Sequence, residues 1–203
     1  MTVRDIPAEL GHALPLPTPS PELRRRLAQR RSAPAQTLAA PGPTADEITE
    51  ILTLGARTPD HGKLFPWRFV VMGPQSRAAI AEQLAALVVA KGLPGKAQAV
   101  LAKLVNPPLS ILVVFTPVDH AKPVWEQQLS AGAVCMNLVH AAGAFGYSAN
   151  WITDWYSYDP AALALFGVAD GEAVAGFVHI GTTAEPPLER PRPDLGSRVI
   201  TLP

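Results

Sequence analysis

"VWEQQLSAGAVCMNLVHAAGAFG", residues 124–146, is the stretch that decides the fold. Its length and the spacing of its apolar residues predict one long helix. Many of its side chains are small and would let another backbone approach closely: Ala131, Gly132, Ala133, Ala141 and Ala142. We therefore expect this helix to be central and to suit a close interface with another helix.

Regular elements are also predicted on both sides of this helix. Apolar runs predict buried strands at residues 67–72, 110–115, 147–152 and 173–181. Helical spacing, together with capping signals at Ser20 and at Thr44 with Glu47, predicts further helices at residues 21–31, 44–57, 77–92 and 160–167. This order of elements is typical of a layered α+β or α/β domain.

The two ends of the chain lack such periodicity. Residues 1–19 end in the Pro-rich "ALPLPTPS", which predicts a flexible lead with little fixed structure. Residues 184–203 hold five prolines and three arginines without a helical period, and they end in the strand-like "RVITL". We therefore divide the chain into a lead (1–19), one main domain (20–183) and an extended C-terminal arm (184–203).

Composition limits the partners that the chain can have. Lys plus Arg number 17 and Asp plus Glu number 17, so the 203 residues offer no overall basic field for nucleic acid. The chain has neither a signal-like N-terminus nor a run of about eighteen apolar residues that could cross a membrane. We expect a cytoplasmic protein without nucleic-acid or membrane partners, in which the single cysteine, Cys135, is a core residue.

The familiar motifs of nucleotide, metal and hydrolase sites are missing. The chain contains no G-x-G-x-x-G after a strand, no G-x-x-x-x-G-K-[ST], no H-E-x-x-H and no G-x-S-x-G. Its five histidines, at positions 12, 61, 120, 140 and 179, lack the spacing of metal ligands. We expect no metal site.

One short bend concentrates polar groups. "TPDHGKLFPWRF", residues 58–69, places His61 and Lys63 between two prolines. One interpretation is a surface turn in which Asp60 caps the turn and both cations face water. The other is a stiff loop that holds cations at a functional site. Trp67, at the start of the following strand, is predicted to be a core residue.

Four segments together resemble a known family. "RRSAPAQTL" (30–38), "GARTPDHGKLFPWRFVVM" (55–72), "PVWEQQLSAGAVCMNLVHAAGAFGYSANW" (123–151) and "IGTTAEPPLERPRP" (180–193) are similar, in order and spacing, to the FMN-dependent nitroreductases. Within that family they resemble the compact branch of small NAD(P)H nitroreductases, over about residues 20–200. The resemblance implies an α+β sandwich of helices around a mostly antiparallel sheet. It also implies an intertwined homodimer with two FMN sites at its interface.

By this resemblance, Arg30, Arg31 and Ser32 bind the FMN phosphate. The chemistry agrees, because a guanidinium fork and a hydroxyl recognise a phosphate dianion through charge-assisted hydrogen bonds. Near the C-terminus, Arg190 or Arg192 completes this anion site. The alternative for Arg30 and Arg31 is that they form a solvated basic helix end with three more arginines at positions 24–26. The alternative for Arg190 and Arg192 is an extended surface position.

The resemblance places Arg57 and His61 beside the flavin ring. It places Trp151 under the flavin or over the substrate pocket, with Asn150 and Ile152 as its backbone neighbours in the cofactor site. Cations near the ring would favour its reduced, negatively charged state, which gives the bend a chemical purpose. Lys63 either shares this role or is solvated. The compact branch often has Arg and then Thr-Gly after the tryptophan, whereas this chain has Ile152, Thr153 and Asp154, so a phosphate or substrate contact from that position is in doubt.

The function implied is an FMN oxidoreductase that takes hydride from NADH or NADPH and reduces a nitroaromatic, a quinone or a similar small-molecule acceptor by alternating half-reactions. The flavin itself would be the reactive group, so no side chain is assigned as catalytic. Two alternatives are a specialised flavin enzyme of the same fold, such as a dehalogenase or enoyl-type reductase, and a flavin-binding storage or regulatory protein. A fold cannot separate these, because function lies in the site.

Overall fold

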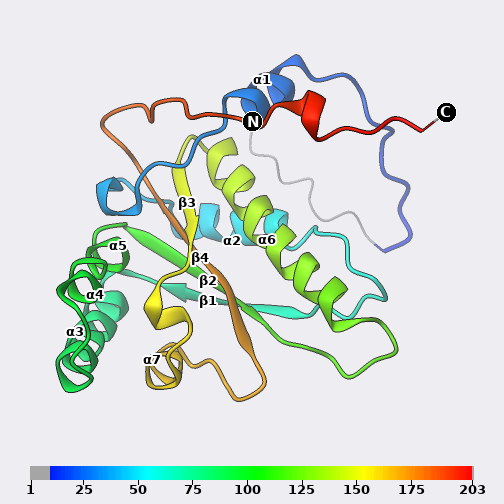
Figure 1. The fold of residues 1–203 in the computed structure, drawn as a ribbon. Coiled ribbons are helices and arrows are strands. Elements are labelled where there is room, and N and C mark those ends of the chain that lie inside the picture. The colour runs from blue at the N-terminus through cyan, green and yellow to red at the C-terminus, as the bar shows by residue number, and fades with distance from the viewer. Residues whose placement is uncertain (1–9, 203) are drawn as a thin grey trace.

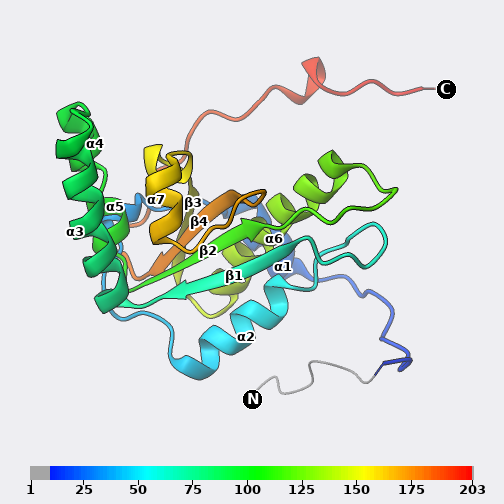
Figure 2. The ribbon, with the colours of Figure 1, turned by 90° about the horizontal axis from the view of Figure 1, so that it is seen from below.

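A computed structural model describes residues 10–202 as three layers, with a sheet between two groups of helices (Figures 1 and 2). The sheet contains β1 (Trp67–Met72), β2 (Leu109–Phe115), β3 (Ser148–Ile152) and β4 (Ala173–Gly181). The strand order is β1-β2-β4-β3, and each neighbouring pair is antiparallel. The predicted α+β sandwich with an antiparallel sheet is confirmed, and its four strands match the predicted ones within one or two residues.

Helices cover both faces of the sheet. They are α1 (Pro21–Gln29), α2 (Ala45–Gly55), α3 (Pro74–Ala90), α4 (Gly95–Ala99), α5 (Ala102–Val105), α6 (Val124–Ala144) and α7 (Pro160–Leu165). Residues of α2 and α6 share one core with one face of the sheet, whereas α3, α5 and α7 contribute to the core on the other face. Three short 3-10 turns, at 35–37, 155–157 and 195–197, complete the described elements.

The long helix α6 is central, as predicted. Its inner face, which includes Val134, Cys135 and Leu138, is fully buried. A Cβ added at Gly55 of α2 would lie 2.5 Å from Cδ2 of Leu138, so the absence of a side chain there lets the two helices pack closely. Burial raises the pKa of the Cys135 thiol to about 12, as expected for a core residue. Trp67 is buried in the same core.

An aromatic cluster fills the opposite core. The ring centres of Phe177 in β4 lie 5.3 Å from Tyr156 and 5.0 Å from Phe166, in edge-to-face arrangements. All three side chains are buried between the sheet and the helices of that face. Such pairs add specific contacts to the burial of apolar area. Phe177 is therefore a central packing residue on the face away from α6.

Some predicted boundaries were wrong. The first helix ends at Gln29 rather than Arg31, because Arg30 adopts an extended conformation (φ −58°, ψ 123°). The second begins at Ala45, directly after Thr44, the N-cap of the predicted capping box with Glu47, but it ends at Gly55, two residues before Arg57. The short helices α4 and α5 were not predicted, since four or five residues show too little periodicity to detect.

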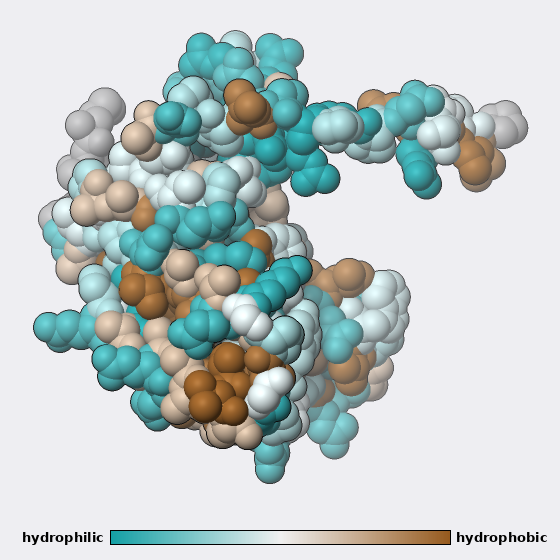
Figure 3. All heavy atoms as spheres, turned by 60° about the vertical axis from the view of Figure 1, so that its left-hand side comes forward, coloured by the Kyte–Doolittle hydropathy of each residue, from teal (hydrophilic) through white to brown (hydrophobic). Residues whose placement is uncertain are grey.

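The ends of the chain differ from the domain between them. Of the predicted lead, residues 1–9 lie outside the described residues, and residues 12–19 are exposed and have no regular structure. Residues 189–202 are exposed throughout, and Figure 3 shows this segment extending away from the body of the molecule. Among residues 10–202, no strand is formed at "RVITL". Among the helices between residues 10 and 202, none has the length and apolar character needed to cross a bilayer.

Candidate functional site

A stripe of partly exposed residues runs along one side of α6. Its residues recur every three or four positions, which places them on one side of the helix: Trp125, Leu129, Gly132, Met136, His140 and Gly143. Trp125 and Leu129 are 61% and 60% exposed, and the other four are half-buried. We call these six residues the α6 stripe. The residues predicted to bind a flavin lie at its two ends and beside it.

Near the N-terminal end of α6, hydrogen bonds attach the bend at residues 57–66 to this helix. Ser130 Oγ donates to the carbonyl oxygen of Pro59 at 2.7 Å. His61 Nδ1 lies 2.6 Å from Glu126 Oε2, in the first turn of α6. Asn137 Nδ2, further along α6, also donates to Thr58 Oγ1 at 2.7 Å. The bend is therefore attached to this helix at three points, and the exposed His61 ring is oriented by a carboxylate.

The bend has an unusual backbone. Lys63 and Phe65 both have positive φ, at 57° and 48°, a conformation that L-residues rarely adopt. The Asp60 carboxylate accepts a hydrogen bond from the backbone N–H of Phe65 at 2.8 Å, so it does cap the turn. Arg57 and Lys63 are exposed, and within residues 10–202 neither forms an ion pair. Strained residues of this kind persist only where the surroundings hold them.

At the other end of the stripe, the chain after α1 separates the three predicted phosphate ligands. Arg30 Nη1 donates to Ser32 Oγ at 3.3 Å, so these two side chains point the same way. Arg31 points to the other side, where its Nε donates to the carbonyl oxygen of Leu188 at 2.7 Å. Because residues 30–32 are extended rather than helical, alternate side chains share a side.

The C-terminal arm lies across this segment. Arg192 Nη2 donates to the carbonyl oxygen of Arg30 at 3.3 Å and to Glu189 Oε1 at 2.9 Å. Arg31 Nε also lies 3.9 Å from Glu189 Oε1. Of the two candidate arginines in the arm, Arg192 therefore reaches the predicted phosphate ligands, but its guanidinium is engaged by Glu189. Arg190 is exposed.

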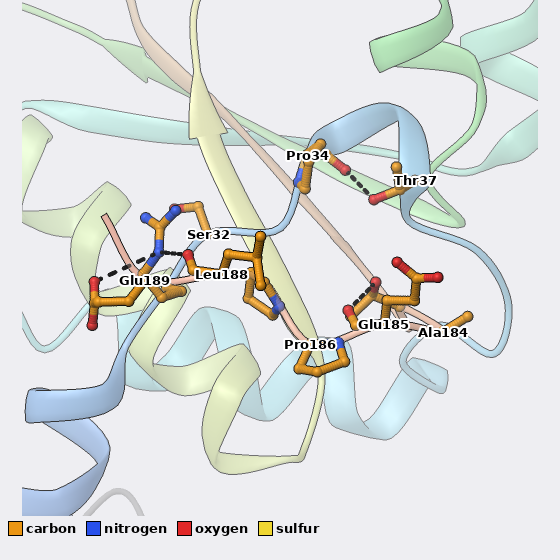
Figure 4. A pocket seen from close by; sticks show the side chains of 11 residues that line it. Ser32, Pro34, Thr37, Ala184, Glu185, Pro186, Leu188 and Glu189 are labelled. Atoms are coloured by element: carbon orange, nitrogen blue, oxygen red, sulfur yellow. Dashed lines mark hydrogen bonds and ion pairs between the residues drawn. The ribbon is translucent and has the colours of Figure 1, made fainter. Parts of the chain in front are cut away.

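Two cavities adjoin residues 30–32. One, of about 490 Å³, lies between residues 31–37 and residues 183–189 of the arm (Figure 4). The other, of about 350 Å³, lies between the end of α1, the C-terminal half of α6 and the start of β3. Its basic lining residues are Arg26, Arg30, Arg31 and His140. Burial, and then the charges of Arg30 and Arg26, lower the pKa of His140 below its usual value.

The predicted residues of β3 alternate between the faces of the sheet. Asn150 Nδ2 donates to the carbonyl oxygen of Ala33, which attaches the edge strand to the segment after α1. Trp151 is on the α6 side, where Nε1 donates to the carbonyl oxygen of Ala175 at 3.2 Å. Ile152 follows Trp151 and, like Asn150, points to the opposite face.

The Trp151 ring lies over Gly176 of β4. A Cβ added at Gly176 would lie 2.0 Å from Nε1 of Trp151. A Cβ added at Gly132 in the α6 stripe would lie 3.8 Å from the far edge of the same ring. The register between β2 and β4 shifts between Val113 and Val114, so Ala175 has no partner in β2. The carbonyl group that holds the indole thus belongs to a bulged residue.

Gly176→Ala is expected to displace the Trp151 ring. The added Cβ would overlap the indole, and overpacking of this kind costs about 1–3 kcal/mol. The thermal midpoint should fall, and the same change made together with Trp151→Ala should have little further effect, because the clash has been removed. Gly95→Ala is the matched control, since no atom lies within 4 Å of its added Cβ. Equal losses with and without Trp151 would contradict this account.

Within one chain, the predicted residues form two groups rather than one site. His61 contacts Glu126, whereas Arg30 and His140 line the same cavity. At 1.5 Å per residue, the 14 positions from Glu126 to His140 span about 21 Å along α6. Trp151 lies between the groups, beside Gly132. Figure 1 shows the same separation, with α1 near the C-terminal end of α6 and the loop after α2 near its N-terminal end.

The family model for nitroreductases, described as "Nitroreductase family", matches residues 27–182, well over half of the chain. This chain belongs to the nitroreductase family. Two similar curated proteins carry related names. YdjA of Escherichia coli strain K12, named a putative NAD(P)H nitroreductase, is 33% identical over 161 residues, which cover 77% of this chain and 85% of YdjA. A protein of the same description from Haemophilus influenzae is 36% identical over 152 residues, covering 73% and 82%.

Solved structures support the fold of this nitroreductase. A nitroreductase-like protein from Bacillus cereus matches with a TM-score of 0.79 at 17% identity, covering 92% of this chain and 99% of the other. A nitroreductase from Bacteroides fragilis with bound FMN matches with a TM-score of 0.70 at 19% identity, covering 91% and 100%. At these identities the likeness concerns the fold.

Two basic residues near the predicted phosphate ligands of this nitroreductase were not predicted from the sequence. Arg26 and His140 line the same cavity as Arg30. One signal was available for Arg26, which lies four positions before Arg30 and so on the same side of the last turn of α1. No comparable signal marks His140, because its position depends on how α1 packs against α6.

Proposed function

We propose that this nitroreductase is an FMN-dependent oxidoreductase that takes hydride from NADH or NADPH and passes electrons to nitroaromatic, quinone or similar acceptors. The observation that carries the proposal is the α6 stripe, which has Gly132 near its middle, a fixed indole beside it and arginines at one end. The related proteins from Escherichia coli and Haemophilus influenzae are named as putative NAD(P)H nitroreductases, and these names support the same activity. Bound FMN would supply the redox chemistry, by accepting hydride and then giving up electrons.

The residues present fit such a cofactor. Arg26 and Arg30 form no ion pair within residues 10–202, so the phosphate end offers uncompensated positive charge. Gly132, beside Trp151, has no side chain that would keep a flat ring away from the helix. Arg30 and Ser32 would bind the phosphate. The hydrogen bond to Ala175 and the contact with Gly176 would keep Trp151 in one place while the ring binds.

We further propose a homodimer in which each flavin contacts both chains. Arg57 and His61 lie about 21 Å along α6 from the arginine group, by the helical rise given above. A partner related by a two-fold axis and packed on the α6 stripe would bring its own bend toward this arginine group. Burial of Trp125 and Leu129 would supply hydrophobic stabilisation for the contact.

In this arrangement, Glu126 would act as a positioning residue for His61. It accepts a hydrogen bond from Nδ1–H of the imidazole, so the imidazolium form would keep a second N–H, at Nε2, to donate to a ring bound across the interface. Arg57 would add positive charge at the same edge. Both groups would favour negative charge on a bound ring, because donors already in place need no reorganisation.

The proposed function predicts that the purified protein is yellow and holds about one FMN per chain. Heat-released cofactor should be FMN, and NADH or NADPH should be oxidised when a nitrofuran or quinone is added. FAD, or no flavin after incubation with FMN, would contradict the proposal. Tight FMN binding without NAD(P)H oxidation would favour a storage or regulatory protein. Turnover only with a halogenated or α,β-unsaturated acceptor would favour a specialised enzyme.

The homodimer predicts a solution mass of about twice 21.5 kDa. Leu129→Glu should produce monomers and weaken FMN binding together, because a carboxylate would be buried in an apolar contact. Val89→Glu is the matched control, since Val89 is an exposed apolar residue of α3, far from the stripe. Removal of residues 184–203 should also weaken both properties if the arm joins the partner. A monomer with full FMN affinity would place the site within one chain.

A further inference from the structure

The three adjacent arginines of α1 differ in their surroundings. Arg24 and Arg25 are exposed, whereas Arg26 is half-buried against α6. A Cβ added at Gly143 would lie 2.1 Å from Nη2 of Arg26, so the guanidinium occupies the space that a side chain at position 143 would fill. Arg26 therefore lies directly against the end of the α6 stripe.

Arg26 and Arg30 bring two positive charges to one cavity without a counter-ion. Within residues 10–202 neither guanidinium lies within 4.0 Å of a carboxylate, whereas Arg31 and Arg192 both meet Glu189. Like charges held close together destabilise each other unless an anion joins them. The cavity of about 350 Å³ between α1 and α6 is large enough for one.

His140 is a third basic residue at this cavity, and one of its ring nitrogens is unpaired within residues 10–202. It lines the same space, and its Nδ1 is buried with no hydrogen-bond partner. Buried polar atoms are almost always paired, so an unpaired one indicates a missing partner. Tyr147, another lining residue, already donates its hydroxyl to Glu47 at 2.9 Å. The basic groups left for a ligand are thus the guanidinium groups of Arg26 and Arg30 and the imidazole, and the neutral Gln29 and Ser148 line the cavity beside them.

We propose that Arg26 and His140 join Arg30 in binding a phosphate monoester in this cavity, and that this is the phosphate of FMN. The inference rests on the proposed function for the choice of ligand. From His140, the α6 stripe runs eight residues, about 12 Å, to Gly132 beside Trp151. A ligand whose phosphate lies at His140 can therefore extend along the stripe toward the indole.

The test compares FMN and riboflavin, which lacks the phosphate, in titrations of the cofactor-free protein followed by flavin fluorescence. Arg26→Ala should raise the dissociation constant for FMN by about 5- to 50-fold and change that for riboflavin less than about twofold. His140→Phe should raise the FMN constant by about 3- to 10-fold. Arg25→Ala, which removes an exposed neighbouring charge, should leave both constants within about twofold.

Other roles for Arg26 give different results. If it only stabilises the C-terminal end of α6, Arg26→Ala would lower the thermal midpoint and weaken FMN and riboflavin equally, which overturns the proposal. An effect on the KM for NADPH but not on FMN binding would also overturn it. Full FMN affinity in Arg26→Ala would overturn this inference while the proposed function stands.

A parent protein that binds no flavin would instead overturn the proposed function. In that case the anion site is tested with inorganic phosphate alone. Phosphate should raise the thermal midpoint of the parent and of Arg25→Ala, but not that of Arg26→Ala, because a ligand stabilises only the folded form that binds it. Equal stabilisation of all three proteins would overturn the site itself.

Discussion

Arg30→Ala is expected to raise the dissociation constant for FMN by about 30-fold to several-thousand-fold. A bidentate guanidinium–phosphate contact is charge-assisted, and its loss leaves a dianion under-compensated, at a cost of about 2–5 kcal/mol in a largely desolvated site. Arg30 lines the cavity between α1 and α6, and its Nη1 donates to Ser32 Oγ, so both proposed phosphate ligands lie together. The variant should elute pale and regain colour only in excess FMN.

Arg24→Ala provides the matched control for this result. Arg24 belongs to α1, is exposed and forms no ion pair within residues 10–202, so its removal should change FMN affinity by well under about 1 kcal/mol. Both changes remove one positive charge from the same part of the chain. Riboflavin should bind the parent and both variants about equally weakly. If both variants lost FMN equally, Arg30 would act through the general field rather than through the phosphate.

Phe177→Ala is expected to destabilise the fold by about 3–5 kcal/mol. Phe177 is fully buried in the central strand β4, with Tyr156 and Phe166 packed against its ring. Its removal would leave a cavity that these neighbours, held on separate elements, cannot fill. For a chain of this length the thermal midpoint should fall by about 6–20 °C, measured by calorimetry or circular dichroism on the cofactor-free protein.

Two further variants serve as comparisons for the loss of folding stability in Phe177→Ala. Phe177→Leu keeps most of the volume and should cost about 1.5 kcal/mol or less, and Tyr158→Ala, at an exposed aromatic residue, should be nearly neutral. Below its melting temperature, Phe177→Ala should still bind FMN, because Phe177 faces away from the α6 stripe. A small change in midpoint, or lost FMN affinity in a folded variant, would show that the two sides of the sheet are not independent.

Much of the fold is predictable from local patterns. The capping box at Thr44 and Glu47, the apolar run of β2 and the spacing of α6 each depend on neighbours in the sequence, and each predicted element is present. The burial of Cys135 and Trp67 follows from the same patterns, because apolar runs of that kind lie inside. The short helices α4 and α5 escape prediction, since they form by packing rather than by periodicity.

The candidate site is predictable only in part. Motif order and spacing indicate the family, and they name Arg30, Ser32 and Trp151 as cofactor contacts that stay predictions. In the sequence, Arg26 differs from Arg24 and Arg25 only by its spacing of four positions from Arg30, because all three have the same chemistry. Their difference arises from Gly143, more than a hundred residues away, which lets one guanidinium rest on α6.

The rest of the site geometry also depends on residues that are distant in the sequence. Trp151 is held by a carbonyl group in a bulge of β4 and by the glycine that follows it, and both depend on strand register. The separation of His61 from Arg30 depends on where the bend and α1 meet opposite ends of α6. Periodicity and caps act over a few residues, so they specify helices and strands one at a time. Charges and cavities at a site form where distant segments pack, and that arrangement is set by the whole chain at once.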